Sequence, residues 1–261
     1  MRVLVLLLLI ILPARAEPVV IPGPEGIELR GELLLPDGVP VAPAIVALHG
    51  CGGRYQLRDE QWGGFLGARG HIVLFVDSFG SRGLGSQCRE TRRAVTPAGL
   101  RRRDALAAAQ WLVERPDTPA GGVVLMGWSD GGSTVLAAGR DHPTRRGLVR
   151  GLVAFYPGCR VAARLGGWQP VAPMLILHGE ADDWTPIWPC RALAEEVGAA
   201  VQLVAYPGAY HNFDVDIPIR VMRDIPSSQR GDGTVHVGGD PAARQDAMAR
   251  VLAFLAALPV K

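Results

Sequence analysis

The sequence predicts an α/β fold in which helices cover both faces of a mostly parallel central sheet. Short runs rich in Val, Ile and Leu recur along the chain, and helix-like stretches separate them. A strand buried on both faces is a near-continuous apolar run, and parallel neighbours need a crossover that is usually a helix. Neither an internal repeat nor a Pro/Ser-rich linker interrupts residues 17–261, so one domain is expected there.

The individual elements follow from this pattern. The strand candidates of the parallel sheet are residues 44–49, 71–77, 122–127, 151–157, 174–179 and 201–207. Ahead of them, Glu25 to Pro36 alternates in polarity and predicts an antiparallel edge hairpin with the preceding "PVVIP". Helices are expected near residues 58–69, 98–114, 132–140, 187–197 and 242–258. The last follows Pro241, which suits a first helical turn, and carries apolar residues at helical spacing.

Residues 212–240 lose this rhythm. A segment of that length without clear elements is unusual inside a compact domain and is often functional. Two interpretations stay open at this point: the segment borders an active site, or it is a surface excursion.

The first sixteen residues have the pattern of a cleaved secretory signal. Arg2 precedes an apolar run from Val3 to Leu12, and the run ends in a proline and the small-residue triplet "ARA". An apolar run of about ten residues is well short of the roughly 20 that a bilayer span needs. We therefore expect a signal peptide over residues 1–16, a mature chain from Glu17, and a periplasmic or secreted protein without membrane attachment after cleavage.

The charge balance gives no reason to expect a nucleic-acid partner. The chain has 27 Lys and Arg against 25 Asp and Glu, and removal of Arg2 and Arg15 with the signal leaves 25 against 25. A near-neutral chain lacks the basic surface that phosphate backbones attract. The Arg-rich stretch over residues 88–104 is the local exception, and we interpret it as a solvated helix face with its preceding loop.

Four cysteines in a chain bound for an oxidising compartment predict two disulfides. Three pairings are possible, and the placement of the cysteines favours Cys51 with Cys88 and Cys159 with Cys190, because each pair links loops on the same edge of the sheet. Free buried thiols are the alternative. The chain has no closely spaced Cys or His pair of the kind that binds zinc, and we expect neither a metal nor an organic cofactor.

A candidate nucleophile lies between the strand over residues 122–127 and the helix that follows it. Gly127-Trp128-Ser129-Asp130-Gly131 matches the G-x-S-x-G pattern of a sharp strand-to-helix turn that presents a reactive serine. Glycines are needed at both ends, because the serine backbone is strained and side chains there would collide with the strand and the helix. The interpretation as an ordinary Ser-Gly turn is weakened by the strand before it and the helix after it.

A serine nucleophile needs a base, and the base needs an orienting acid. His211 lies just beyond the strand over residues 201–207, and Asp182 and Asp183 follow the strand over residues 174–179. Serine, acid and base thus occur in the chain order of such hydrolases. The alternatives are a solvent-facing loop histidine and a carboxylate that only caps the next helix.

These residues lie in segments that resemble the dienelactone hydrolase family of the α/β-hydrolase superfamily. The segments are "ALHGCGG", "VDSFGSRG", "GWSDGG", "HGEADDWTP" and "YPGAYHNFD", in family order from about Ala47 to Asp214. The resemblance implies the α/β-hydrolase fold. In the family, the acid lies three residues after the glycine that ends its strand and four residues before a proline, and Gly179 and Pro186 then select Asp182. The enzyme that gives the family its name has a cysteine where this chain has Ser129, so the dienelactone substrate is not carried over.

The resemblance also implies where substrate binds. The backbone amides of Cys51 and Asp130 are the candidates for the oxyanion hole. Arg82 lies near the place where the family can have an arginine that receives a substrate carboxylate. Independently of the resemblance, Trp128, Trp184 and Trp188 flank the proposed catalytic residues and are candidates for the wall of an apolar acyl pocket, with a role in packing as the alternative.

The function expected from the sequence is a serine hydrolase that cleaves small-molecule esters or lactones through an acyl-enzyme. One alternative is a small serine peptidase related to prolyl oligopeptidases, although such enzymes normally carry a further large domain for which this chain has no room. The other is a non-catalytic binding protein with the same fold, against which the intact Ser, Asp and His set argues. The sequence predicts no oligomeric state.

Overall fold

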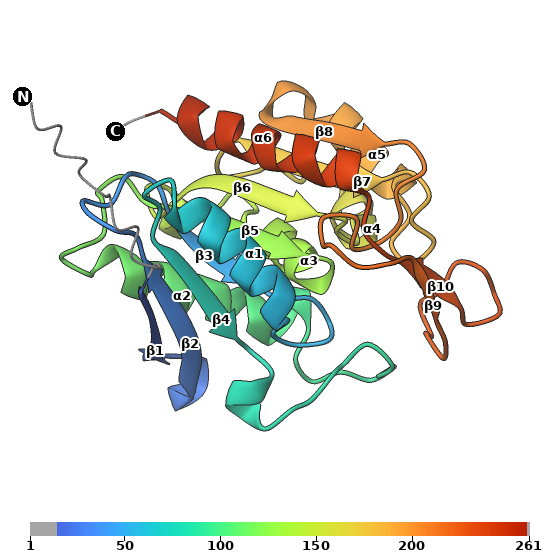
Figure 1. The fold of residues 1–261 in the computed structure, drawn as a ribbon, viewed down its shortest axis with the longest axis horizontal. Coiled ribbons are helices and arrows are strands. Elements are labelled where there is room, and N and C mark those ends of the chain that lie inside the picture. Colours follow the sequence, from blue (N-terminus) through green and yellow to red (C-terminus); the bar gives the residue numbers. More distant parts are fainter. Residues whose placement is uncertain (1–14, 260–261) are drawn as a thin grey trace, which may run out of the picture.

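An eight-stranded sheet forms the centre of the protein in the computed structural model, which describes residues 15–259 (Figure 1). The predicted signal peptide lies outside the described residues except for its last two. The strand order is β1-β2-β4-β3-β5-β6-β7-β8. The strands are β1 (Arg15–Pro22), β2 (Glu28–Leu35), β3 (Ala44–Leu48), β4 (Val73–Asp77), β5 (Val123–Trp128), β6 (Val149–Phe155), β7 (Met174–Gly179) and β8 (Val201–Tyr206).

The sheet is parallel from β4 to β8, and β1 and β2 form an antiparallel hairpin at one edge. All six parallel strands therefore end at the same edge of the sheet. The loops that carry the candidate site residues follow β3, β5, β7 and β8 at that edge. This is where open α/β sheets bind their ligands.

Helices cover both faces of the sheet, as predicted (Figure 1). One face packs against α1 (Gln56–Gly67) and α6 (Pro241–Ala257), and the other against α2 (Arg102–Val113), α3 (Asp130–Ala138) and α5 (Trp188–Val197). Successive side chains of β3 alternate between these two cores. The Asp240 side chain caps α6 by accepting a hydrogen bond from the Ala243 amide.

The segment over residues 212–240 is not a plain loop. It forms a two-stranded antiparallel ribbon, β9 (Arg220–Met222) with β10 (Val235–Val237), which projects beyond the sheet edge in Figure 1. Val237 also makes a bridge with His211, and the Gly238 amide donates to the His211 carbonyl at 2.9 Å. The ribbon is thus attached to the loop that carries the candidate base.

The predicted elements are present, with boundaries shifted by a few residues. The sequence did not indicate the ribbon or the short α4 (Arg160–Arg164). Both predicted disulfides, Cys51–Cys88 and Cys159–Cys190, are present. Within residues 15–259, every helix is too short or too polar to cross a membrane.

Candidate active site

Ser129 stands at the turn between β5 and α3, with a backbone that few non-glycine residues adopt. Its φ and ψ angles are 55° and −115°. The turn is held from both sides, because the Ser129 amide donates to the Phe155 carbonyl at 2.9 Å and the Ser129 carbonyl accepts from the Ser133 amide at 2.8 Å. Strain of this kind persists only where the surroundings enforce it, and it is concentrated at functional sites.

The two glycines of the turn are required by space. A Cβ at Gly131 would lie 2.0 Å from the Leu48 carbonyl oxygen, and one at Gly127 would lie 2.4 Å from the Gly131 carbonyl oxygen. No side chain fits at either position, because both gaps are filled by backbone. The start of α3 can therefore lie directly against β3 and behind the serine.

His211 and Asp182 are paired, as the sequence predicts. The two residues are almost completely buried, and His211 Nδ1 lies 2.7 Å from Asp182 Oδ2. Asp182 Oδ1 accepts hydrogen bonds from the amides of Trp184 and Thr185, both at 2.9 Å. Burial by itself would raise the pKa of Asp182, but His211 and the hydrogen bonds outweigh it and hold the pKa below its ordinary value. Asp182 is therefore a carboxylate at neutral pH.

Asp183, the other candidate acid, has a different partner. Its carboxylate accepts from the His236 amide at 2.8 Å and lies 2.7 Å from His236 Nδ1. Asp183 thereby fastens the ribbon to the loop after β7. The geometry agrees with the choice of Asp182 as the partner of His211.

The two amides expected to form the oxyanion hole lie next to Ser129. Asp130 is the first residue of α3, and Cys51 follows Gly50, whose added Cβ would lie 3.6 Å from Ser129 Cβ. Within the described part of the chain, neither the Cys51 amide nor the Asp130 amide donates to another residue. Both remain available to an oxygen bound beside Ser129.

The Arg-rich stretch is only in part the solvated helix face that the sequence suggested, because Arg103 on α2 is exposed but Arg101 is buried. Arg101 is 1% exposed and donates to the Asp130 carboxylate and, at 2.6 Å, to the His49 carbonyl. Arg93 reaches the same carboxylate at 2.8 Å. Two arginines of this stretch thus hold the side chain of Asp130, the residue that follows Ser129.

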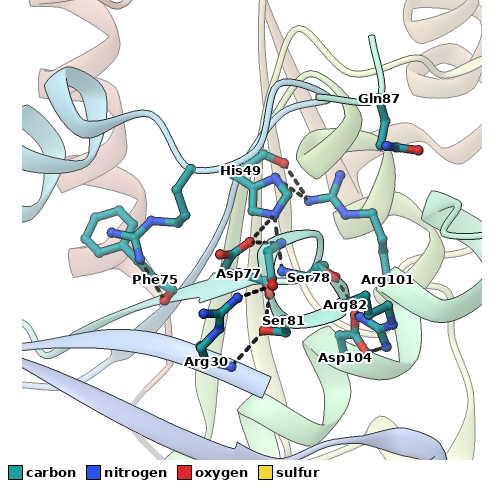
Figure 2. A network of polar contacts seen from close by, with 12 residues as sticks. Arg30, His49, Phe75, Asp77, Ser78, Ser81, Arg82, Gln87, Arg101 and Asp104 are labelled. Carbon is teal, nitrogen blue, oxygen red and sulfur yellow. Dashed lines mark hydrogen bonds and ion pairs between the residues drawn. The ribbon is translucent and has the colours of Figure 1, made fainter. Parts of the chain in front are cut away.

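His49 lies against Arg101 and stays neutral. Burial is the main cause that lowers its pKa well below the usual value, and the charge of Arg101 adds to it. The hydrogen bonds fit a neutral ring, because Nδ1 lies 2.7 Å from the Gly50 carbonyl and Nε2 accepts from the Ser78 amide at 3.2 Å (Figure 2). The ring joins the end of β3 to the loop after β4.

A cavity of about 850 Å³ opens beside Ser129. Trp184 and Thr185 are part of its wall, and they connect it to the buried pair: the Trp184 ring packs 4.8 Å from the His211 ring, and Thr185 Oγ1 lies 3.1 Å from His211 Nδ1. The ribbon also contributes to the wall, through Pro226, Ser227, Ser228 and Gln229. Of the two interpretations of residues 212–240, the border of the site is the one that the structure supports.

Arg82 does not reach this cavity. Its guanidinium makes two hydrogen bonds of 2.8 Å to the buried carboxylate of Asp104 and one of 2.7 Å to the Ser78 carbonyl (Figure 2). The structure thus uses Arg82 to hold the loop after β4 against α2. The arginines of the cavity wall are Arg93, Arg102, Arg140 and Arg160.

Trp128 is likewise not a wall of an acyl pocket. It is 1% exposed, stacks on Phe155 at 5.7 Å, and belongs to the core on the α1 and α6 side of the sheet. Its side chain points away from the cavity because Trp128 is the last strand residue before Ser129, and alternate residues of a strand face opposite sides. Of the three tryptophans proposed from the sequence, only Trp184 borders the cavity, and Trp188 is exposed at the surface.

Asp214 is a residue of this region that sequence reasoning missed. It is completely buried and accepts hydrogen bonds from Trp62 Nε1 and Trp128 Nε1 at 2.8 Å and from the Tyr156 hydroxyl at 2.5 Å. These donors come from α1, β5 and the residue after β6. The Tyr156 ring packs 4.5 Å from the His211 ring. By holding the Tyr156 hydroxyl, Asp214 therefore fixes an aromatic ring that packs against His211. Its position three residues after the predicted base was the available signal.

Residues 15–259 contain no group of three or more His, Cys, Asp or Glu side chains arranged to bind a metal ion. The candidate site is built of a serine, a buried Asp-His pair, backbone amides and arginines.

The chain was compared with known proteins. The family model described as "Dienelactone hydrolase family" matches residues 29–258. The dienelactone hydrolase structure from Anabaena variabilis is 21% identical, with 95% of this chain and 100% of that chain covered at a TM-score of 0.67. The thermophilic esterase Est2 from Thermogutta terrifontis, solved with propionate bound, is 21% identical, with 94% and 96% covered at a TM-score of 0.64. No curated protein matches the chain.

The buried hub at Asp214 gives a stability prediction. Asp214→Ala leaves two indole N–H groups and one phenol without an acceptor, and should lower the free energy of unfolding by about 3–5 kcal/mol. Asp216→Ala is the matched control, because that carboxylate is 77% exposed and pairs with Arg244 at the surface, so its loss should cost under about 1 kcal/mol. Urea unfolding measures both changes. Equal stabilities of the two variants would contradict the role of Asp214.

Proposed function

We propose that Ser129 is the nucleophile of this chain, which belongs to the dienelactone hydrolase family and is a carboxylic ester hydrolase. The observation that carries the proposal is the strained turn at Ser129 together with the buried His211–Asp182 pair, on loops that follow β5, β7 and β8 at one sheet edge. A serine, a histidine and a carboxylate so placed are the parts that acyl transfer to a hydroxyl requires.

In the proposed reaction, Ser129 Oγ attacks the carbonyl carbon of the ester or lactone while His211 Nε2 takes the serine proton. His211 Nδ1–H donates to Asp182, which orients the ring and stabilises its positive charge. The amides of Cys51 and Asp130 donate to the oxyanion. His211 then protonates the leaving alcohol, and the bond between carbonyl carbon and leaving oxygen breaks.

The acyl group on Ser129 is next removed by water. His211 takes a proton from the water as its oxygen attacks the acyl carbon, and the same two amides hold the second oxyanion. Return of the proton to Ser129 Oγ releases the acid. Serine depends on such a base more than cysteine does, because a hydroxyl is a weaker nucleophile than the thiol of the family's namesake.

The cavity wall favours a substrate that carries a negative charge. The one carboxylate on the wall, Asp130, is already paired with Arg93 and Arg101. Among the described residues, Arg102 and Arg140 form no ion pair with a carboxylate, and Arg102 Nε is buried without a hydrogen-bond partner. We propose that an anionic group of the substrate, distant from the scissile bond, lies near these two arginines.

We also propose export. The two disulfides suit an oxidising compartment, and residues 1–16 have the composition of a signal peptide. Edman sequencing of protein recovered from the periplasm or medium should begin at Glu17.

The catalytic assignment predicts an order among variants. Ser129→Ala should abolish turnover of p-nitrophenyl acetate, and Asp182→Asn should lower kcat by roughly 10³- to 10⁴-fold because the histidine loses its orienting charge. Asp183→Asn is the matched control and should cost under about fivefold, since Asp183 binds His236 instead.

A larger loss for Asp183→Asn than for Asp182→Asn would show that the acid is wrongly assigned. A fluorophosphonate should label Ser129 in the wild-type protein, and folded protein that is not labelled would favour the non-catalytic binding alternative. Hydrolysis of peptides in preference to esters would favour the peptidase alternative.

The arginine wall predicts a preference for charged substrates. Mono-p-nitrophenyl glutarate should show a kcat/KM about fivefold above that of the neutral p-nitrophenyl valerate, which corresponds to roughly 1 kcal/mol of charge attraction at a solvated site. The preference should shrink as salt is raised.

Arg102→Gln should remove most of this preference. Arg103→Gln is its control, because Arg103 pairs with Glu25 and is not part of the cavity wall. A neutral substrate that is turned over as well as the anionic one by the wild-type protein at low salt would contradict the proposed subsite.

A further inference from the structure

The loop that contributes the Cys51 amide is packed at its start, where His49 is buried, but not at its end. This loop, residues 49–53 and called here the oxyanion loop, has the sequence His-Gly-Cys-Gly-Gly. A Cβ at Gly52 or Gly53 would meet nothing within 4 Å. Glycine has the widest choice of backbone conformations, so two glycines with no side chain to pack hold a backbone less firmly than other residues would. An oxyanion donor must be held in place before the reaction, because it lowers the barrier most when no free energy is spent on moving it into position.

Cys51 is held at two points by one other segment. Its side chain forms the disulfide with Cys88, and its carbonyl accepts a hydrogen bond from the Gln87 amide at 2.7 Å. The preceding carbonyls are also fixed, since His49 O accepts from Arg101 at 2.6 Å and Gly50 O lies 2.7 Å from His49 Nδ1. The Cys51 amide itself donates to no described residue, so it is free to donate to an oxygen of the substrate.

The segment that holds Cys51 has no helix or strand between residues 83 and 96. It is anchored to the site by Arg93, which pairs with Asp130, and by Arg89, which donates to the Arg223 carbonyl of the ribbon at 3.1 Å. The disulfide itself packs in a small apolar cluster with Trp184 and with ribbon residues. That cluster comprises Cys51, Trp184, Ile225, Val235 and Val237, with Cys88 and Met222 against it. The disulfide thus connects the oxyanion loop with the ribbon and with Trp184 of the loop after β7.

The second disulfide provides a natural comparison. Cys159–Cys190 joins the start of α4 to α5 and packs in the core that contains α2, α3 and α5, not in the cluster of Cys51, although Cys159 also borders the cavity. The two disulfides span 37 and 31 residues, so they restrict the unfolded chain to a similar extent. A difference between them in catalysis would therefore not follow from loop length.

We propose that the Cys51–Cys88 disulfide positions the oxyanion hole, with Cys88 acting as a positioning residue for the Cys51 amide. This inference rests on the proposed function, because it assumes acyl transfer at Ser129. It gives the first disulfide a role in the rate of the reaction that the second one does not have.

The test compares two double variants, Cys51→Ala/Cys88→Ala and Cys159→Ala/Cys190→Ala, with p-nitrophenyl acetate below both melting temperatures. Both should lose thermal stability. The first should lose tenfold or more in kcat, up to the roughly 10²- to 10³-fold that removal of one oxyanion donor costs, with KM changed by less than about threefold. The second should keep kcat within about twofold of the wild-type value, because the contact that Cys159 makes with the cavity can change substrate binding, and so KM, without moving the oxyanion donors.

A second measurement separates positioning from general loosening. An aryl trifluoromethyl ketone forms a hemiketal oxyanion with the nucleophilic serine, so its inhibition constant should rise in the first double variant by the factor by which kcat/KM falls. In the second double variant the inhibition constant should change by no more than KM does. If the first double variant does not fold, Cys88→Ser replaces it, because this change leaves Cys51 in place. If that variant also fails to fold, partial reduction of wild-type protein with a phosphine, mapped by mass spectrometry, should lower activity in step with opening of Cys51–Cys88.

Three results would overturn the inference: equal kcat losses in the two double variants, a wild-type kcat in the first, or a loss confined to KM. These outcomes differ from a failure of the proposed function, which would appear as absence of esterase activity and of fluorophosphonate labelling in the wild-type protein itself.

Discussion

The backbone of Ser129 is the constraint on which the rest of the site depends. A φ of 55° with a ψ of −115° costs on the order of 1–3 kcal/mol, and the protein maintains it through close backbone contact. Gly131 lies so near the Leu48 carbonyl that only glycine fits, which fixes α3 against β3. The same contact brings the oxyanion loop after β3 beside the serine. The strained turn thus fixes the relative positions of the proposed nucleophile, Ser129, and of the Asp130 and Cys51 amides, which are the proposed oxyanion donors.

The other parts of the site are held by buried polar contacts between loops of the same sheet edge. Arg101, although buried, is matched by the Asp130 carboxylate and the His49 carbonyl, and the neutral His49 ring adds no second charge beside it. Asp214 accepts from three buried donors beneath His211. Removal of one member of such a network leaves its partners unsatisfied in a medium of low polarity, so each loop is fixed by contacts that are costly to break.

Much of this arrangement could be predicted from the sequence, because it depends on local patterns. Apolar runs gave the strands, and chain order gave Ser129, Asp182 and His211. The parts that were missed depend on long-range partners. Arg82 is bound by Asp104, and Trp128 faces the far core because of strand alternation. The burial of Arg101 could not be predicted from its polar neighbours in the sequence. It depends on the carboxylate of Asp130, which lies 29 residues further along the chain. The ribbon was not visible in the sequence because its strands have three residues each and pair mainly with one another.

The central claim is that an acyl group is transferred to Ser129. The most direct measurement is to mix the protein with a slowly deacylated p-nitrophenyl ester, stop the reaction with acid within the burst, and determine the mass of the intact chain and of its peptides. The account predicts one added acyl group, located on the peptide that contains Ser129 and absent from Ser129→Ala. Full turnover without an adduct in Ser129→Ala, or an adduct at another residue of the wild-type protein, would contradict it.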